Sequence, residues 1–310
     1  MRTMRLARTC LLLASFLGCA VPAARADAGA DEPAHPALWT LADEDTAVVL
    51  FGTVHLMRPG VDWFDGEVRR AFDASDEVVL ETLRLDPAEE QALVTRLGVD
   101  GSGRTLRSRL GKGERARYEA AVRSLGMPAG ALDPFEPWLA AVTLATVPLM
   151  QAGYRPELGV EAVLEEEAER AGKTLVGLET SEWQLGPFDA FDESVQLGML
   201  NATVAELDAV PADMRTMEAL WLAGRAEELG AMAAEMMAGY GDDDAIAEAL
   251  LGDRNRTWAD WVEARMSRPG RVLVAVGAAH LAGEDALPAL LEAKGYEVER
   301  VRPAAAPADD

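Results

Sequence analysis

The sequence predicts an α/β (α+β) fold whose central sheet is formed from two similar units, one near each end of the chain, with a large helical region between them. Two continuous apolar runs, residues 46–51 and 271–276, have the length and composition of buried strands. Each run leads directly into a Gly-x-x-His motif, and a helical pattern and a short strand pattern follow. Between the two units, apolar residues recur mainly with the helical period.

The N-terminal unit begins with residues 38–41, which predict a short strand, and an acidic turn at 43–45 precedes the buried strand 46–51. The unit then continues, in order, with Gly52-Thr53-Val54-His55, a helix at 63–74, a strand at 76–80 and the strand-terminal Glu81. A histidine and a glutamate therefore follow two strands of the same unit.

The middle of the chain is predicted to be mostly helical. Helical spacing of apolar residues is found at 87–97, 113–125, 137–152, 161–171, 188–209, 211–224, 226–239 and 242–265. One short strand at 174–178 ends at Glu179, which repeats the order of helix, strand and glutamate. Six methionines lie between Met199 and Met237, and we expect them to form helix core, although a methionine stripe also suits an adaptable peptide groove.

The C-terminal unit repeats the opening pattern. It consists of the strand 271–276, the motif Gly277-Ala278-Ala279-His280, a helix at 283–294 and a last strand at 296–301. Two such units can join in one sheet, so the sequence predicts a single composite domain over 27–310 with an ordered core at about 37–302.

The first 26 residues have the features of a signal peptide: a basic start, an apolar segment at 11–20 and the small-residue site Ala24-Arg25-Ala26. We therefore expect an exported protein, periplasmic or extracellular, that begins at Asp27. Leu17-Gly18-Cys19 is a partial lipobox, and the alternative is a lipoprotein anchored at Cys19. The two cysteines, Cys10 and Cys19, both precede the cleavage site, so the mature chain would contain neither a disulfide nor a thiolate metal site.

The net charge of −24 argues against binding to nucleic acid, because phosphate backbones attract basic surfaces. After the first 26 residues no apolar run reaches the roughly 18 residues that a membrane-spanning helix needs. The motifs HExxH, GxSxG and GxxxxGK[ST] are absent from the sequence. These observations favour a globular protein whose candidate site lies outside these motifs.

The histidines are the most informative residues. The chain has three, and two of them, His55 and His280, each close a Gly-x-x-His motif at the carboxyl end of a predicted strand. Ligands bind at that edge of open α/β sheets, and Gly52 and Gly277 would permit the tight turns. Imidazole is a common ligand of transition metals and an acid or base near neutral pH. Each histidine taken alone could instead be a structural residue at a strand end.

Carboxylates and one polar segment complete the candidate site. Glu81 and Glu179 each follow a short apolar strand, where burial of a carboxylate is costly unless a metal, an arginine or a backbone amide compensates it. The segment 253–256 contains Asn255 and Arg256, and an arginine there can bind a substrate carboxylate or stabilise a developing anion. Salt bridges and helix capping are the structural alternatives.

Taken in succession, these motifs resemble the TraB/PrgY/GumN family, which includes the Tiki proteins. The resemblance covers residues 39–301 and rests on Leu50-Phe-Gly-Thr-Val-His55, Val78-Val-Leu-Glu81, Gly177-Leu-Glu-Thr180 with Gln184, Arg254-Asn-Arg256 before Trp258, and Val276-Gly-Ala-Ala-His-Leu-Ala-Gly-Glu284. It implies an α/β core with paired Gly-x-x-His motifs and, for the Tiki branch, a divalent-metal-dependent protease related in architecture to erythromycin esterase-like hydrolases. His55, His280 and Glu81 match family site positions, and Glu179, Asn255 and Arg256 match further ones.

From the residues and the resemblance together we expect an exported divalent-metal-dependent hydrolase of the peptidase class. His55, His280 and Glu81 would hold Mn, Co or Zn, Glu81 and Glu179 would take part in catalysis, and Arg256 would stabilise the oxyanion or a substrate carboxylate. The alternative is a non-catalytic protein that sequesters a secreted peptide or another small ligand in the same cleft. The GumN name alone would add an accessory role in polysaccharide processing.

Overall fold

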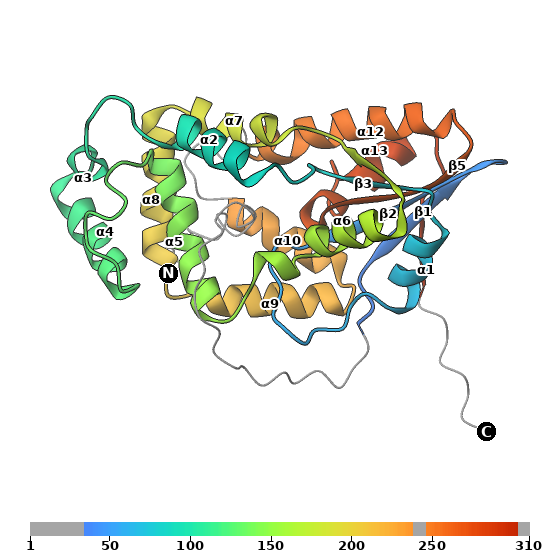
Figure 1. The fold of residues 1–310 in the computed structure, drawn as a ribbon, viewed down its shortest axis with the longest axis horizontal. Helices are drawn as coiled ribbons and strands as arrows, with labels where there is room; N and C mark the ends of the chain where they lie inside the picture. Colours follow the sequence, from blue (N-terminus) through green and yellow to red (C-terminus); the bar gives the residue numbers. More distant parts are fainter. Residues whose placement is uncertain (1–33, 238–245, 303–310) are drawn as a thin grey trace, which may run out of the picture.

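The computed structural model describes residues 34–237 and 246–302 and has the mixed α/β architecture that the sequence predicts. The predicted signal peptide, the beginning of the predicted helix 242–265 and the C-terminal tail lie outside the described residues, so export and the lipid anchor at Cys19 stay predictions. Six strands form one sheet, and helices cover both of its faces (Figure 1).

The strands of the sheet lie in the order β4-β3-β5-β2-β1-β6. Their bounds are β1 Leu38–Ala42, β2 Thr46–Thr53, β3 Glu77–Leu80, β4 Thr174–Gly177, β5 Gly270–Gly277 and β6 Glu299–Arg300. The neighbours β4, β3, β5 and β2 are parallel, whereas β1 runs antiparallel to both β2 and β6. Four strands therefore present their carboxyl ends at the same edge.

Strand β5 joins the two ends of the chain. It lies between β3 and β2, and its register with β2 runs from Thr46 opposite Gly270 to Thr53 opposite Gly277. The two predicted units thus form one sheet, and both Gly-x-x-His motifs leave it at the same edge.

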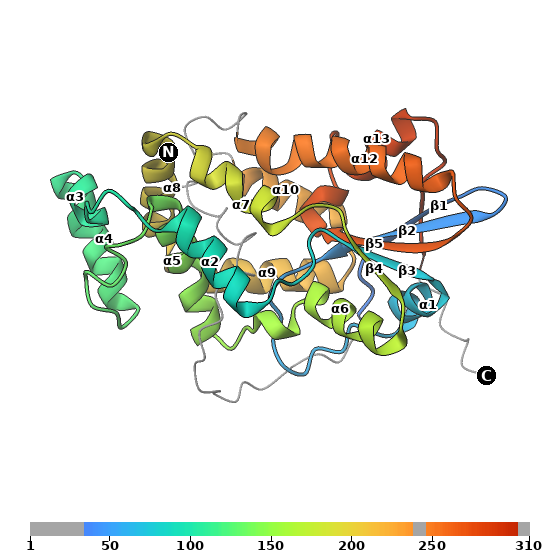
Figure 2. The same ribbon diagram turned by 45° about the horizontal axis from the view of Figure 1, so that its top comes forward.

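Alternate residues of β5 pack against different helix layers, as the period of two in a strand requires. Val272, Val274 and Val276 contact the layer formed by α12 (Asp253–Met266) and α13 (Leu287–Ala293). Leu273 and Ala275 belong to the opposite core. That core includes residues of α1 (Gly66–Ala74), α6 (Val160–Ala171), α9 (Val210–Leu222) and α10 (Ala226–Met237). Figure 2 shows α12 and α13 on one face of the sheet and α6 on the other.

The remaining helices extend the molecule away from the sheet (Figures 1 and 2). They are α2 (Pro87–Gly98), α3 (Leu106–Arg109), α4 (Lys112–Ser124), α5 (Pro137–Gln151), α7 (Ser181–Ala190) and α8 (Glu193–Glu206). Helix α5 is buried along most of its length and contributes to the apolar clusters with α2 and α7 and with α4 and α8. Short helical turns, η2 (Pro156–Leu158), η3 (Glu248–Gly252) and η4 (Ala278–Leu281), lie beside the sheet edge or lead to it.

Several predicted element bounds differ from the structure, among them the predicted helix 283–294, which forms only over α13 (Leu287–Ala293). The predicted helix 188–209 is divided into α7 and α8, because Thr180 caps the earlier start of α7 and Asp192 has an extended backbone before α8. The predicted strand 296–301 pairs only over Glu299–Arg300. Met199, Met214 and Met217 are buried, as expected of helix core.

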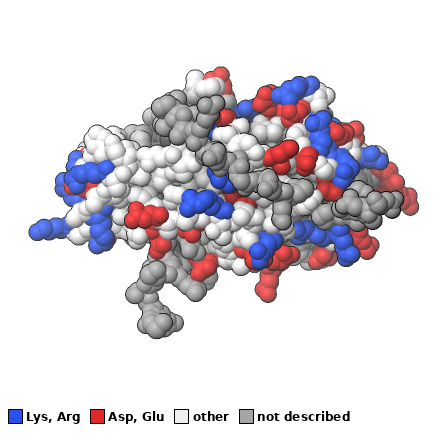
Figure 3. All heavy atoms as spheres, turned by 90° about the horizontal axis from the view of Figure 1, so that it is seen from below, with Lys and Arg blue, Asp and Glu red and all other residues white. Residues whose placement is uncertain are grey.

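Charges of both signs are interspersed on the face shown in Figure 3. This agrees with an acidic surface in which many carboxylates are paired, rather than a patch of a single sign. Among the described residues, the helices are all too short or too polar to cross a lipid bilayer.

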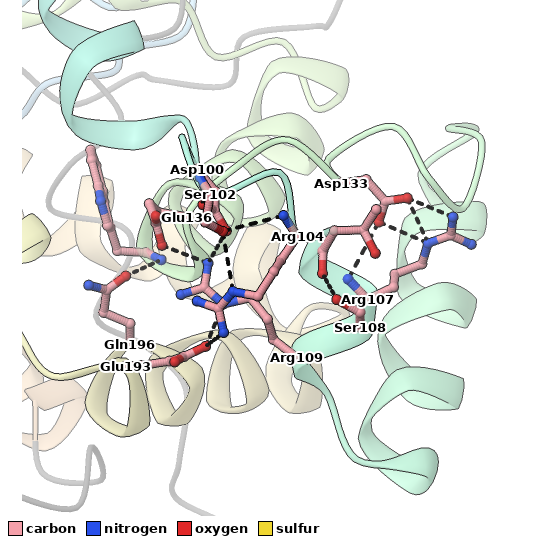
Figure 4. A network of polar contacts seen from close by, with 12 residues as sticks. Asp100, Ser102, Arg104, Arg107, Ser108, Arg109, Asp133, Glu136, Glu193 and Gln196 are labelled. Atoms are coloured by element: carbon pink, nitrogen blue, oxygen red, sulfur yellow. Dashed lines mark hydrogen bonds and ion pairs between the residues drawn. The ribbon is translucent and has the colours of Figure 1, made fainter.

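A buried arginine ties three segments of the helical region together (Figure 4). Arg109, at the end of α3, contacts Asp100 at 3.3 Å, Glu136 at 2.7 Å and Glu193 at 2.5 Å, and its side chain is 5% exposed. Asp100 precedes α3, Glu136 occupies the N-cap position of α5, and Glu193 is the first residue of α8. Arg109 therefore neutralises charges that would otherwise repel one another where the helices meet.

We expect Arg109→Met to lower the free energy of unfolding by about 2–3 kcal/mol, because the partly buried carboxylates lose their shared cation. Urea unfolding at pH 7 measures the change. Arg96→Met is the control, since Arg96 is 54% exposed and its partner Glu182 is 63% exposed, so its loss should cost less than about 1 kcal/mol. Equal changes for the two variants would contradict the role given to Arg109.

Candidate functional site

The predicted histidines and glutamates lie at the carboxyl edge of the sheet. His55, Glu81, Glu179 and His280 follow β2, β3, β4 and β5, which are neighbouring parallel strands. Their convergence follows from topology, since the carboxyl ends of parallel strands meet at one edge. Residues that are more than 200 positions apart in the sequence thereby join one site.

Both motif glycines lie in close contact with neighbouring groups. A Cβ atom at Gly52 would lie 3.1 Å from Cα of Ala278, and a Cβ at Gly277 would lie 3.0 Å from Oε1 of Glu81. A larger residue at either position would require these neighbours to shift by a few tenths of an ångström. The two glycines thus bring the strand ends close to the following turn and to Glu81.

His280 is a buried, neutral imidazole of defined tautomer. Its Nδ1 lies 2.7 Å from Oδ1 of Asn255, and Nδ2 of Asn255 donates to the carbonyl oxygen of Asp285 at 2.8 Å. This orientation of the amide makes Nδ1 of His280 the donor and leaves its Nε2 unprotonated. Burial, and then the charge of Arg254, lower the pKa of His280 to about 3.

Arg254 connects the edge residues. Its Nη2 donates to Glu81 at 2.6 Å and to Glu179 at 2.5 Å, and its Nη1 lies 3.2 Å from Nε2 of His280. The guanidinium also lies over the ring of Trp258, with its carbon 4.6 Å from the ring centroid. One cation therefore holds two carboxylates and faces the lone pair of an imidazole.

The two glutamates around Arg254 have opposite pKa shifts. Burial would raise the pKa of Glu81, but Arg254, the protonated His55 and the amide of Gly277 outweigh it and hold this pKa at about 2. Glu81 also accepts a hydrogen bond from Nε2 of Gln184 at 2.7 Å. Burial dominates at Glu179 and raises its pKa to about 7 in spite of Arg254. Glu81 is thus a fixed anion, and Glu179 titrates near neutral pH.

His55 carries the opposite charge to His280. Its Nδ1 lies 2.9 Å from Oε1 of Glu161 on α6, and the hydroxyl of Thr53 donates to the same oxygen. Burial lowers the pKa of His55, but Glu161, with a contribution from Glu81, outweighs burial and raises it to about 9. The second imidazole is accordingly an imidazolium at neutral pH, oriented by a carboxylate.

Arg256 does not contact this cluster. Its side chain is 46% exposed and pairs with Glu248 and with Asp253 at the surface of α12. The arginine of this segment that reaches the carboxylates is Arg254. The spacing of Arg254 and the buried Trp258 is a sequence signal that could have identified it, because positions i and i+4 share one helix face.

Glu161 and Gln184 are further contacts that the candidate set lacked. Gln184 belongs to the segment after Gly177-Leu-Glu-Thr180, but nothing in the sequence indicates that its amide reaches Glu81. Glu161 begins an acidic helix in which several glutamates have similar surroundings in the sequence. Only the packing of α6 against the end of β2 distinguishes Glu161.

A cavity of about 330 Å³ adjoins the cluster and is lined by His55, Glu81, Gln184 and residues of α2, η2 and α6. A cavity of this size accommodates a small ligand or part of a peptide. Arg254 contacts Glu81, but neither Arg254 nor His280 is among the residues that line this cavity. His55 and Glu81 are therefore the cluster residues that a ligand in this cavity would meet.

Comparison with known proteins gives a match over the whole sheet and its helices. The model of the TraB/PrgY/gumN family matches residues 37–300. The chain belongs to this family. Within the TraB/PrgY/gumN domain, the segments that carried the resemblance are those that build the sheet edge, from Gly52 to His280.

Two curated relatives are similar to part of this TraB/PrgY/gumN chain. They are the proteins named "Uncharacterized protein YbaP" from Escherichia coli (strain K12) and from Shigella flexneri, each 27% identical over 154 residues. The match covers 50% of this chain and 55% of each relative, so it spans about half the length of either protein. No solved structure matches the chain.

The Tiki-like resemblance implies a divalent metal, and the edge supplies the donor types, imidazole and carboxylate, that such an ion takes. Each motif histidine has its Nδ1 held by an oxygen acceptor, Glu161 or Asn255, which is how protein ligands of a metal are usually oriented. Within the described ranges, however, no three His, Cys, Asp or Glu side chains are arranged to hold an ion together. Arg254 lies against Nε2 of His280, so ligation by that nitrogen requires the guanidinium to move away.

Proposed function

We propose that this TraB/PrgY/gumN protein is a divalent-metal-dependent hydrolase that cleaves peptides. The observation that carries the proposal is the convergence of His55, Glu81, Glu179 and His280 on the carboxyl ends of four neighbouring strands, beside a cavity. In metal-assisted hydrolysis, imidazoles and carboxylates gathered at such an edge usually bind the ion and transfer protons.

Each residue of the cluster would have a separate role. His55, His280 and Glu81 would hold the ion, which when bound supplies a Lewis acid and an acidified water. Asn255 would keep His280 in the tautomer that presents Nε2, and Glu161 would orient His55, whose Nε2 would lose its proton when the ion binds. Glu179, with its pKa near neutral, would accept and return a proton, and Arg254 would balance the charges of Glu81 and Glu179.

Metal removal tests this proposal. Protein purified without chelator should contain a divalent ion, and dialysis against chelator should abolish cleavage of a peptide library. At least one of Mn(II), Co(II) and Zn(II) should restore cleavage. His55→Ala and His280→Ala should neither retain the ion nor regain activity, because each removes one of three proposed ligands.

His35→Ala serves as the control, since His35 has an exposed ring, contacts Glu67 and lies outside the edge cluster. It should retain the ion and the activity of the unaltered chain. Cleavage that survives chelation unchanged, or loss of activity in His35→Ala equal to that of the other two variants, would contradict the metal assignment.

One observation favours a second function, a non-catalytic protein that sequesters a peptide. Arg254 already pairs with Glu81 and Glu179 and faces His280, so these groups satisfy one another without a ligand or ion. Such a saturated network can be a rigid wall of a binding cleft. Tight peptide binding without cleavage, with every added ion, would favour this function over hydrolysis.

A further inference from the structure

Two cavities of different character share His55. The larger cavity, of about 330 Å³, extends from His55 and Glu81 over α2, η2 and α6. A smaller one, of about 40 Å³, extends from His55 and the turn 277–279 to α9 and α10. The side chain of His55 therefore forms part of the wall of both cavities.

The larger cavity has more negative than positive charge. Its walls include five glutamates, of which three have a cationic partner: Glu81 with Arg254, Glu161 with His55 and Glu165 with Arg84. The other two, Glu90 of α2 and Glu157 of η2, form no ion pair with any residue that the structure describes. A cationic group of a ligand would complete the pairing.

Glu90 is the better placed of these two carboxylates. It is half-buried, and burial raises its pKa, which means that the chain itself does not compensate the cost of its charge. Its neighbour Glu89 is exposed and does not line the cavity. Two adjacent glutamates of α2 therefore differ in their surroundings: Glu90 lines the cavity, whereas Glu89 is exposed to solvent.

The smaller cavity is apolar apart from His55 and Thr53. Met214 and Met217 of α9 and Leu229 and Ala233 of α10 form its helical wall, and all four are buried. Its volume of about 40 Å³ suits an aliphatic side chain of modest size rather than an aromatic ring. The methionine segment therefore also contributes a cavity wall, besides forming helix core.

We propose that the substrate is a peptide with a basic residue directly beside a small aliphatic residue, with the bond to be cleaved held at His55. The basic side chain occupies the larger cavity and pairs with Glu90, and the aliphatic side chain enters the smaller cavity against Met214 and Met217. Successive side chains of an extended peptide point in opposite directions, so neighbouring residues can enter different cavities. This inference rests on the proposed peptide hydrolysis.

Matched peptides test the inference with the full chain. An extended peptide containing Ala-Lys is compared with versions containing Ala-Gln, Ala-Glu and Trp-Lys, and both turnover and calorimetric binding to chelator-treated protein are measured. The Ala-Lys peptide should have a kcat/KM at least about tenfold above that of the other three. Glu90→Gln should remove most of the preference for lysine over glutamine, whereas Glu89→Gln should preserve it.

The outcomes separate the inference from the proposed function. Preferential binding of the Ala-Lys peptide without cleavage would support the ligand class and overturn the hydrolase. Cleavage of all four peptides at similar rates would support the hydrolase and overturn the ligand class. Identical behaviour of Glu90→Gln and Glu89→Gln, with both variants folded, would likewise overturn the role of Glu90.

Discussion

Arg254→Met is expected to lower the free energy of unfolding by about 3–5 kcal/mol and to abolish peptide cleavage. The side chain is 10% exposed, and its removal leaves Glu81 and Glu179 facing each other without a cation. The pKa of Glu179, which burial already raises to about 7, should rise further and remove its charge at neutral pH. Urea unfolding and turnover of the same preparations measure both effects.

Arg256→Met is the matched control for this change. It lies two positions away on α12, but its side chain is 46% exposed and its ion pairs are at the surface. It should leave stability and turnover nearly unchanged. Arg254→Lys retains a charge but not the forked contacts, so it should recover part of the stability and little activity. A larger effect from Arg256→Met than from Arg254→Met would contradict the description of the site.

Glu81→Gln is expected to reduce turnover by roughly 10³-fold and to destabilise the fold by roughly 3 kcal/mol at pH 7. The stability estimate follows from the pKa of Glu81, which lies at about 2 instead of its ordinary 4.5 because Arg254 and the protonated His55 hold the charged form. A neutral amide of the same size cannot replace that interaction. Kinetics and urea unfolding measure the two effects.

The stability effect of Glu81 should depend on pH with a definite sign. Because folding depresses this pKa, the contribution is fully present above about pH 4.5 and is lost as the pH falls toward 2. The difference in unfolding free energy between the unaltered chain and Glu81→Gln should therefore shrink between pH 5 and pH 3, the range in which unfolding is measured. A difference that grows on acidification would contradict the assignment.

Glu218→Gln separates the activity of Glu81 from general damage. Glu218 is equally buried and is held by Arg58 at 2.9 Å and Tyr154 at 2.6 Å, but it lines neither cavity at His55. It should be destabilising as well, yet folded protein should keep its turnover. Equal losses of activity in the two variants would show that burial, and not position at the sheet edge, explains the effect of Glu81.

The sequence predicts the strands better than their order. The runs 46–51 and 271–276 are apolar on both faces, which indicates burial between two helix layers. The same property leaves no pattern from which the neighbouring strands could be predicted. Val272 and Leu273, for example, are equally buried although they face different helix layers. The insertion of β5 between β2 and β3 depends on long-range packing that the local pattern does not encode.

The site was predictable where strand ends define it and not where helices supply it. His55, Glu81, Glu179 and His280 each follow an apolar strand, and parallel topology brings such residues to one edge. Arg254 and Arg256 lie on opposite faces of α12, because residues two positions apart in a helix are rotated by about 200° about its axis. The segment around them is polar, so its sequence does not indicate which of the two faces is buried. Glu161 could be recognised only from the packing of α6.

Cleavage of a peptide library in ¹⁸O-labelled water, analysed by mass spectrometry, tests the central claim that this sheet edge is a hydrolytic site. The ion-loaded full chain should generate new carboxyl termini that contain ¹⁸O, and Glu81→Gln should generate almost none while Glu218→Gln generates them at the normal rate. The absence of labelled termini with Mn(II), Co(II) and Zn(II) alike, or equal labelling by the unaltered chain and Glu81→Gln, would contradict the claim.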